Sequence, residues 1–130
     1  MSLVFDTSIL IAIERNDKEI LEKLKELRII YSSSPKITFV TYFEYLVGLK
    51  IRKNKGYYNN LLFLKKFNVL QTTNSTSEIL SDLKIKYDKK GQVISLADLL
   101  MASIVIDNGL ILITKDKDFE IIDELKKIIL

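Results

Sequence analysis

The sequence contains neither cysteine nor histidine among its 130 residues. The lack of cysteine excludes disulfides and thiolate nucleophiles, and the lack of histidine excludes imidazole acid–base catalysis and Ser-His-Asp triads. Zinc fingers are excluded because both of their usual ligands are missing. A catalytic site in this chain must therefore use carboxylates, hydroxyls, lysines or a metal ion that accepts oxygen ligands.

Residues that interrupt helices and strands are few, and long apolar runs are lacking. The four glycines and one proline leave regular secondary structure to dominate. No apolar run approaches the roughly 18 residues that a membrane span needs, and the N-terminal segment, which reaches Asp6 without a cationic leader, does not resemble a signal peptide. We therefore expect no membrane association and a cytoplasmic location. The length predicts a single domain over residues 1–130.

Short β-rich runs alternate with segments of helical periodicity along the chain. The predicted strands are 3–5, 37–40, 68–70, 110–113 and 127–130, and the predicted helices begin near residue 16 and cover 41–54, 57–67, 75–90 and 95–107. The run 110–113 is apolar throughout, as in a central parallel strand that is covered on both faces. This alternation predicts an α/β fold with a parallel sheet.

Acidic residues occupy related places in this pattern. Asp6 follows the first predicted strand, Glu44 follows the second by four residues, and Asp116 follows the apolar run, with Asp118 close behind. Asp98 lies in the first turn of a strongly apolar helix. Ligands of parallel α/β sheets bind at the carboxyl ends of the strands, so we expect these acids to gather at one edge. Gathered carboxylates repel one another unless a cation lies among them, and oxygen ligands favour Mg²⁺ or Mn²⁺.

Helix capping is the alternative interpretation of the same acids. The segments 41–44 and 95–98 have the Ser/Thr-x-x-acid form of a capping box. Asp6 can cap the helix that follows it, and Asp116 and Asp118 can be turn residues. Acids so close to apolar segments are costly unless they are paired or coordinated. The spacing alone leaves both interpretations open.

Four segments carry a resemblance to a known family, and they are spread in order over nearly the whole chain. They are 4–10, 37–48, 94–102 and 109–119. Together they resemble the PIN domain, most closely the small VapC-type toxins of toxin–antitoxin pairs. The resemblance implies an α/β/α sandwich on a parallel sheet of about five strands. It also implies a metal-dependent ribonuclease that binds Mg²⁺ or Mn²⁺, an antitoxin partner and a homodimer.

The resemblance can be carried over position by position. Its three core acids fall on Asp6, Glu44 and Asp98. Its fourth acid falls on Asp116, with Asp118 as the second choice. Hydroxyl positions that support the acids fall on Thr7, Ser8 and Thr114.

These assignments give a hypothesis for the reaction. A metal ion held by Asp6, Asp98 and Asp116, with Glu44 joining directly or through water, would lower the pKa of a water that attacks the RNA phosphorus. Two alternatives remain: a PIN-like nuclease of RNA processing, and a non-catalytic binding module whose acids cap helices.

A basic stretch and an aromatic segment are further candidates for contacts with partners. The basic residues are Lys50, Arg52, Lys53 and Lys55, which can contact RNA phosphates or simply form a solvated helix end. The aromatic segment holds Tyr42, Tyr45 and Leu46, near Glu44. The resemblance implies an apolar groove for the antitoxin there, but a homodimer face or ordinary core would have the same sequence.

Overall fold

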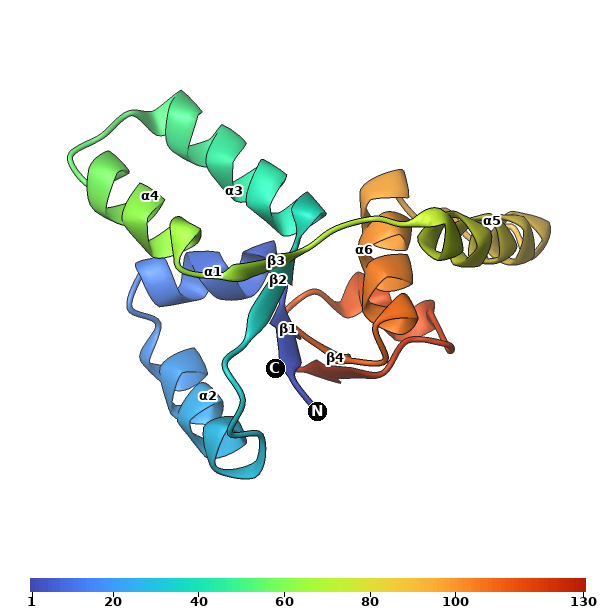
Figure 1. Cartoon of the computed structure of the whole chain (residues 1–130), viewed down its shortest axis with the longest axis horizontal. Helices are drawn as coiled ribbons and strands as arrows, with labels where there is room; N and C mark the ends of the chain where they lie inside the picture. Colours follow the sequence, from blue (N-terminus) through green and yellow to red (C-terminus); the bar gives the residue numbers. More distant parts are fainter.

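The computed structural model describes residues 1–130 and contains one sheet with helices on both sides (Figure 1). The strands are β1 (Leu3–Phe5), β2 (Lys36–Thr38), β3 (Asn68–Leu70), β4 (Ile111–Thr114) and β5 (Lys127–Ile129). The helices are α1 (Thr7–Glu14), α2 (Lys18–Ile30), α3 (Phe39–Arg52), α4 (Tyr57–Lys65), α5 (Asn74–Lys89), α6 (Leu96–Asp107) and the 3₁₀ helix η1 (Lys117–Ile121). None of these helices is both long and apolar enough to cross a membrane.

The five strands pair in parallel throughout, in the order β3-β2-β1-β4-β5. β1 is the central strand, with Val4 opposite Leu112 and Phe5 opposite Ile113 of β4. These four side chains are buried, which explains why both strands are continuous apolar runs without alternation. The prediction of a parallel sheet of about five strands is confirmed.

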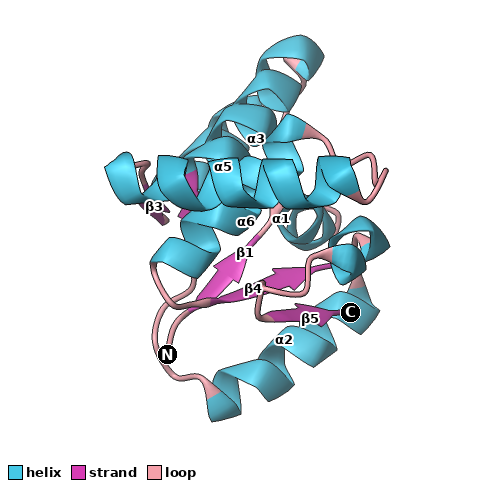
Figure 2. Cartoon of the chain, turned by 90° about the vertical axis from the view of Figure 1, so that its right-hand side faces the viewer, coloured by secondary structure: helices cyan, strands magenta, loops and turns pink.

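Helices cover the two faces of the sheet in separate layers. Because side chains alternate along a strand, Val4 packs with α5 and α6, whereas Leu3 and Phe5 face the layer that includes α1, α3 and α4. Figure 1 shows these layers on the right and left of the sheet, and Figure 2 views the molecule from the side of α5 and α6. The three-layer α/β/α architecture that the resemblance implied is therefore confirmed.

The predicted start of α3 at Thr41 is wrong. The helix begins at Phe39, and Thr38 is its N-cap, whose hydroxyl accepts a hydrogen bond from the Thr41 N–H at 3.2 Å. The predicted strand 37–40 is correspondingly shorter, since β2 ends at Thr38. Glu44 thus lies beyond the first turn and does not complete a capping box with Thr41.

Two other helices also begin at residues that differ from the predicted starts. The helix predicted to begin near residue 16 is α2, which begins at Lys18. Asp17 is its cap and accepts from the Ile20 N–H at 3.3 Å, while Asn16 adopts a left-handed conformation with φ of 59°. The helix predicted over 75–90 is α5, which begins at Asn74, because Thr73 forms a capping box with Thr76.

A buried carboxylate joins three helices on one side of the sheet. The Glu14 side chain, at the end of α1, is 9% exposed. It accepts two hydrogen bonds from the Arg52 guanidinium at 3.0 Å each, one from the Tyr45 hydroxyl at 3.0 Å and one from the Asn60 amide at 2.7 Å. Burial raises the pKa of Glu14, but the bonds from Arg52 and Tyr45 outweigh burial, and the net pKa lies below the ordinary value. The ionised form therefore stabilises the contacts of α1 with α3 and α4.

We predict that Glu14→Gln destabilises the fold in a pH-dependent way. A lowered folded-state pKa stabilises the protein above the unfolded carboxyl pKa of about 4.3, and this contribution is lost as the pH falls through the folded value. At neutral pH the cost should be about 1–2 kcal/mol, in the lower part of the range for charged hydrogen bonds because Arg52 is 38% exposed. Urea titrations at pH 7 and below pH 4 measure it.

Glu26→Gln is the matched control, since Glu26 is an exposed helical acid with no ion pair. It should leave stability within about 0.5 kcal/mol of the parent. An equal cost of Glu14→Gln at both pH values would contradict the assigned role of the Glu14 charge.

Candidate metal centre

Three carboxylates meet at the carboxyl-terminal edge of the sheet. Asp98 lies in the first turn of α6, Asp116 follows β4, and Asp118 lies in η1. One oxygen from each of the three lies within 4.8 Å of the others. Asp98 and Asp116 are half-buried and Asp118 is exposed, so the group is open to solvent on one side.

Asp6 lies at the end of β1 and is 4% exposed. It caps α1, where its carboxylate accepts from the Ile9 N–H at 3.1 Å and from the Ser8 hydroxyl at 2.5 Å, and its second oxygen accepts from the Thr114 hydroxyl. Burial raises the pKa of Asp6, the Ser8 and Thr114 hydroxyls lower it, and the Asp116 carboxylate raises it; the net pKa is raised. Asp6 therefore borders the group of three acids without belonging to it.

The two hydroxyls beside Asp6 also hold the segment that follows β4. Thr114 accepts a hydrogen bond from the Asp116 N–H at 2.9 Å, and Ser8 accepts one from the Lys115 N–H at 3.0 Å. Each hydroxyl donates to Asp6 and accepts from this backbone. The position of Asp116 thus depends on Asp6 through Thr114.

Glu44 lies on α3 and contacts α1 rather than its own helix start. Its carboxylate accepts a hydrogen bond from the Thr7 hydroxyl at 2.6 Å. Burial raises the pKa of Asp98, and the charges of Asp116, Glu44 and Asp118 raise it further. Glu44 therefore acts electrostatically on Asp98, although it too lies outside the group of three acids.

The donor set fits a hard divalent cation. The three oxygens that converge here are all carboxylate oxygens, and the like charges around Asp98 repel one another, which a cation would relieve. Mg²⁺ and Mn²⁺ take oxygen ligands and commonly keep several waters, which the exposed side at Asp118 allows. Asp98, Asp116 and Asp118 are the residues that could hold the ion directly, with Asp6 and Glu44 beside them.

Capping accounts for some of these acids and not for others. Asp6 caps α1, and Asp116 caps η1 by accepting from the Asp118 N–H at 2.9 Å. Ser95 caps α6 through the Asp98 N–H at 3.1 Å, but the Asp98 carboxylate makes no return bond to the Ser95 backbone. Capping and metal binding are therefore compatible at Asp6 and Asp116, and capping explains neither Glu44 nor the carboxylate of Asp98.

The partner candidates from the sequence lie elsewhere on α3. The basic residues are exposed at the C-terminal end of that helix and in the segment that follows it, and Arg52 among them is bound to Glu14. Tyr45 is buried in the core, while Tyr42 and Leu46 are partly buried against it. The exposed apolar side chains of α3 are instead Phe39, Phe43, Val47 and Ile51. The sequence analysis did not identify this stripe or the burial of Glu14. The spacing of four residues between the apolar side chains could have indicated the stripe.

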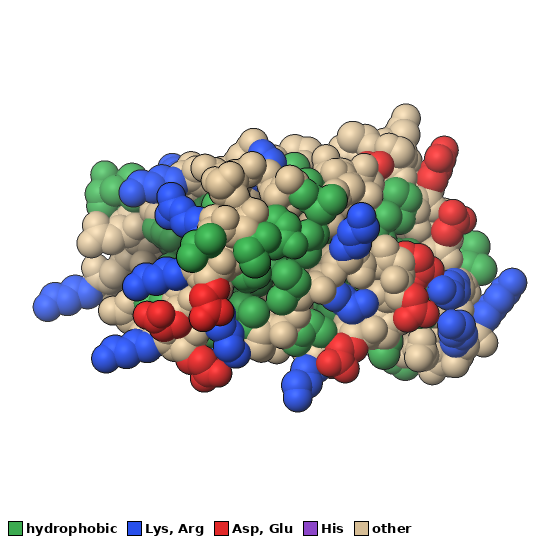
Figure 3. Space-filling model, turned by 90° about the horizontal axis from the view of Figure 1, so that it is seen from below, with side chains coloured by type: hydrophobic (Ala, Val, Ile, Leu, Met, Phe, Trp, Pro, Cys, Tyr) green, Lys and Arg blue, Asp and Glu red, His purple; other side chains and the backbone are tan.

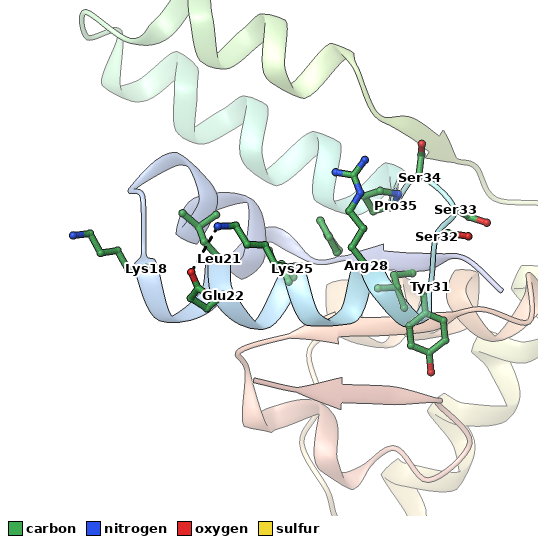
Figure 4. A pocket seen from close by; sticks show the side chains of 13 residues that line it. Lys18, Leu21, Glu22, Lys25, Arg28, Tyr31, Ser32, Ser33, Ser34 and Pro35 are labelled. Carbon is green, nitrogen blue, oxygen red and sulfur yellow. Dashed lines mark ion pairs between the residues drawn. The ribbon is translucent and has the colours of Figure 1, made fainter.

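A larger groove, called here the α2 groove, lies away from the acids. It has a volume of about 640 Å³ between α2, β1 and the loop 31–35 (Figure 4). Leu3, Phe5, Leu21 and Leu24 are apolar residues of its lining; the charged residues are Lys18, Glu22, Lys25 and Arg28. The face that carries α2 and the two termini shows apolar side chains at its centre with charged ones around them (Figure 3).

Known proteins place the chain in a family. The family model of the PIN domain matches residues 3–125. No protein with a curated description matches the sequence.

Solved structures share the fold over nearly their whole length. VapBC2 from Rickettsia felis, bound to a DNA fragment from its promoter, has 23% identity and a TM-score of 0.83, covering 100% of this chain and 99% of that chain. VapBC-1 from nontypeable Haemophilus influenzae has 23% identity and a TM-score of 0.79, with 99% and 98% covered. A toxin–antitoxin complex from Klebsiella pneumoniae has 25% identity and a TM-score of 0.75, with 95% of each chain covered. Because the family model spans nearly all of the sequence, the chain belongs to the PIN domain family.

Proposed function

We propose that this protein is a metal-dependent endoribonuclease that hydrolyses RNA phosphodiester bonds, and that it is the toxin of a VapBC-type toxin–antitoxin pair. The observation that carries the proposal is the group formed by Asp98, Asp116 and Asp118 at the sheet edge of a PIN domain. The similar solved structures are toxin–antitoxin complexes, which supports the toxin role. We also propose that the chain acts as a single domain in the cytoplasm.

Asp98, Asp116 and Asp118 would hold Mg²⁺ or Mn²⁺, and Asp6 and Glu44 would complete the acidic edge. A bound cation of this kind supplies an activated water and stabilises charge on the phosphoryl and leaving oxygens. The protein orients this chemistry through hydroxyls. Thr7 donates to one oxygen of Glu44 and leaves the other to accept from water or substrate. Hydrolysis by water yields 5′-phosphate and 3′-hydroxyl ends, and the lack of histidine disfavours the cyclising route, which usually uses imidazole.

The alternatives differ from this proposal in specific ways. A non-catalytic module with capping acids is disfavoured because Glu44 bonds to Thr7 on another helix. A PIN-like nuclease of RNA processing would share the chemistry and differ in its substrate. A neighbouring gene for a small DNA-binding antitoxin would distinguish the toxin from this second alternative.

We propose that the antitoxin partner binds at the α2 groove. Its apolar lining and its three cations against one acid, Glu22, suit an amphipathic segment that carries acidic side chains. The volume of about 640 Å³ is large enough for several side chains of such a segment.

We propose that the exposed stripe of α3 forms a homodimer. Phe39, Phe43, Val47 and Ile51 are spaced four residues apart, so they form one line along the helix. Phe43 is 59% exposed and Ile51 78%, in a line that no other element of the chain covers. A second copy of α3, related by a two-fold axis, presents the same apolar line, and contact between the two copies would bury both lines.

We predict that Asp98→Asn abolishes both metal uptake and RNA cleavage. The change removes one charge from the group and leaves the helix cap at Ser95 in place. Cleavage of total RNA with Mn²⁺ should fall by more than about 100-fold, since even the loss of a supporting partner costs 10–100-fold. Calorimetric titration with Mn²⁺ and mapping of the cleaved ends are the measurements.

Asp82→Asn is the control, because Asp82 is an exposed acid on α5 that makes no hydrogen bond. It should retain metal uptake and cleavage. Full activity of Asp98→Asn, undiminished activity in EDTA, or 2′,3′-cyclic phosphate ends would each refute the proposed centre.

We predict that Phe43→Asp converts the dimer into a monomer. A carboxylate at the middle of an apolar interface would be desolvated without a partner. Sedimentation equilibrium at micromolar concentration measures the mass. Ile85→Asp, at an exposed apolar position of α5, should leave the dimer intact. A monomeric parent protein would refute the stripe as a dimer interface.

A further inference from the structure

Gly48 occupies the middle of α3, where nothing in the chain requires a glycine. A methyl group placed on its Cα would meet no heavy atom within 4 Å. Its backbone is helical, so no left-handed conformation calls for glycine either. Glycine in a helix interior is less stable than alanine because it loses more backbone entropy on folding. The missing side chain therefore lowers helix stability and keeps a space open.

That space is a groove between α1 and α3, called here the α1–α3 groove, with a volume of about 140 Å³. Thr7 and Glu44, which are hydrogen-bonded to each other, line one end. Arg15, Arg52 and the Glu14 carboxylate that binds Arg52 line the other end. Glu44, Gly48 and Arg52 are four residues apart, so they form one line of about 12 Å along α3. The groove thus leads from the acidic edge to two cations, of which Arg52 is paired with Glu14.

The two arginines of the groove differ in their pairing. Arg52 donates two hydrogen bonds to Glu14 and one to the Gly48 carbonyl at 3.3 Å, so its guanidinium is fixed along α3. The Glu14 carboxylate is fully engaged by its partners on α3 and α4. Arg15 is exposed and takes part in no ion pair. Its free guanidinium is suited to a phosphate, which it can bind through two parallel N–H donors.

The volume of the groove limits what it can take. Sites for whole small molecules usually exceed about 300 Å³. A space of about 140 Å³ suits one group of a longer chain, such as a phosphate with part of its sugar.

We propose that the α1–α3 groove is the subsite for the RNA backbone next to the cleaved phosphodiester. Arg15 binds the phosphate there, and Gly48 leaves room for the sugar-phosphate chain. The inference rests on the proposed ribonuclease function, which supplies the RNA and places the cleavage at the acids beside Glu44.

The proposal is tested with two kinds of substitution, one that fills the α1–α3 groove and one that removes its unpaired cation. Variants are made in the Asp98→Asn background, so that a fluorescent single-stranded RNA can be titrated by anisotropy without being cleaved. Gly48→Leu places a side chain in the groove, starting from a Cβ that meets no heavy atom within 4 Å, and Arg15→Gln removes the unpaired charge. Each should weaken RNA binding by about tenfold or more. Arg15→Gln should also reduce the slope of log K against log salt by about one.

Two further variants separate this role from folding. Gly48→Ala should raise the midpoint of thermal unfolding by about 2–4 °C, since alanine is the better helix former, and Gly48→Leu should unfold no earlier than the parent. Lys89→Gln is the matched control, as Lys89 is an exposed cation at the end of α5 that makes no ion pair and lies outside both grooves. It should bind RNA as the parent does.

The outcomes also separate this inference from the proposed function. If the parent cleaves RNA but Gly48→Leu and Arg15→Gln bind it as the parent does, the subsite is refuted and the ribonuclease stands. If the parent neither binds nor cleaves RNA, both are refuted. If the two variants lose binding of the antitoxin and keep binding of RNA, the groove belongs to the protein partner and the subsite is likewise refuted.

Discussion

The buried carboxylate of Asp6 is the constraint on which the rest of the site depends. A carboxylate that is 4% exposed is costly unless its oxygens are bonded, and here the hydroxyls of Ser8 and Thr114 provide bonds. The same hydroxyls accept from the backbone N–H groups of Lys115 and Asp116. Satisfying Asp6 therefore fastens the segment after β4 to the start of α1. The position of Asp116 follows from this fastening.

The fold brings the other acids to the same edge of the sheet. Their carboxylates therefore repel one another in the folded protein. The raised pKa values of Asp6 and Asp98 reflect burial first and neighbouring carboxylates in addition. A divalent cation among Asp98, Asp116 and Asp118 would relieve this repulsion in the folded state only, because the unfolded chain does not gather the acids. Metal binding and stability are thus linked through the same charges.

The sequence predicts the order of strands and helices along the chain, because the periodicity of the apolar residues determines it. It also predicts the edge where the acids lie, because they follow the ends of predicted strands. It does not predict the cap of α3, since Thr38 and Thr41 are chemically alike and only the point at which the pairing of β2 ends decides between them. Nor does it predict the burial of Glu14, whose partners Arg52 and Asn60 are 38 and 46 residues away in sequence. Contacts over such separations arise from packing of helices, and local pattern carries no signal for them.

Helix α3 shows how one element can serve separate purposes through its spacing of four. Tyr45 and Leu49 form the line that is buried in the core. Phe43 belongs to the exposed apolar line on nearly the opposite side of the helix, and Glu44 and Gly48 belong to the line between them, which faces α1. Adjacent residues of a helix differ by about 100° in direction, so a change on one line leaves the others in place. Folding, association and substrate contact can therefore vary independently along this helix, although the residues involved are neighbours in sequence.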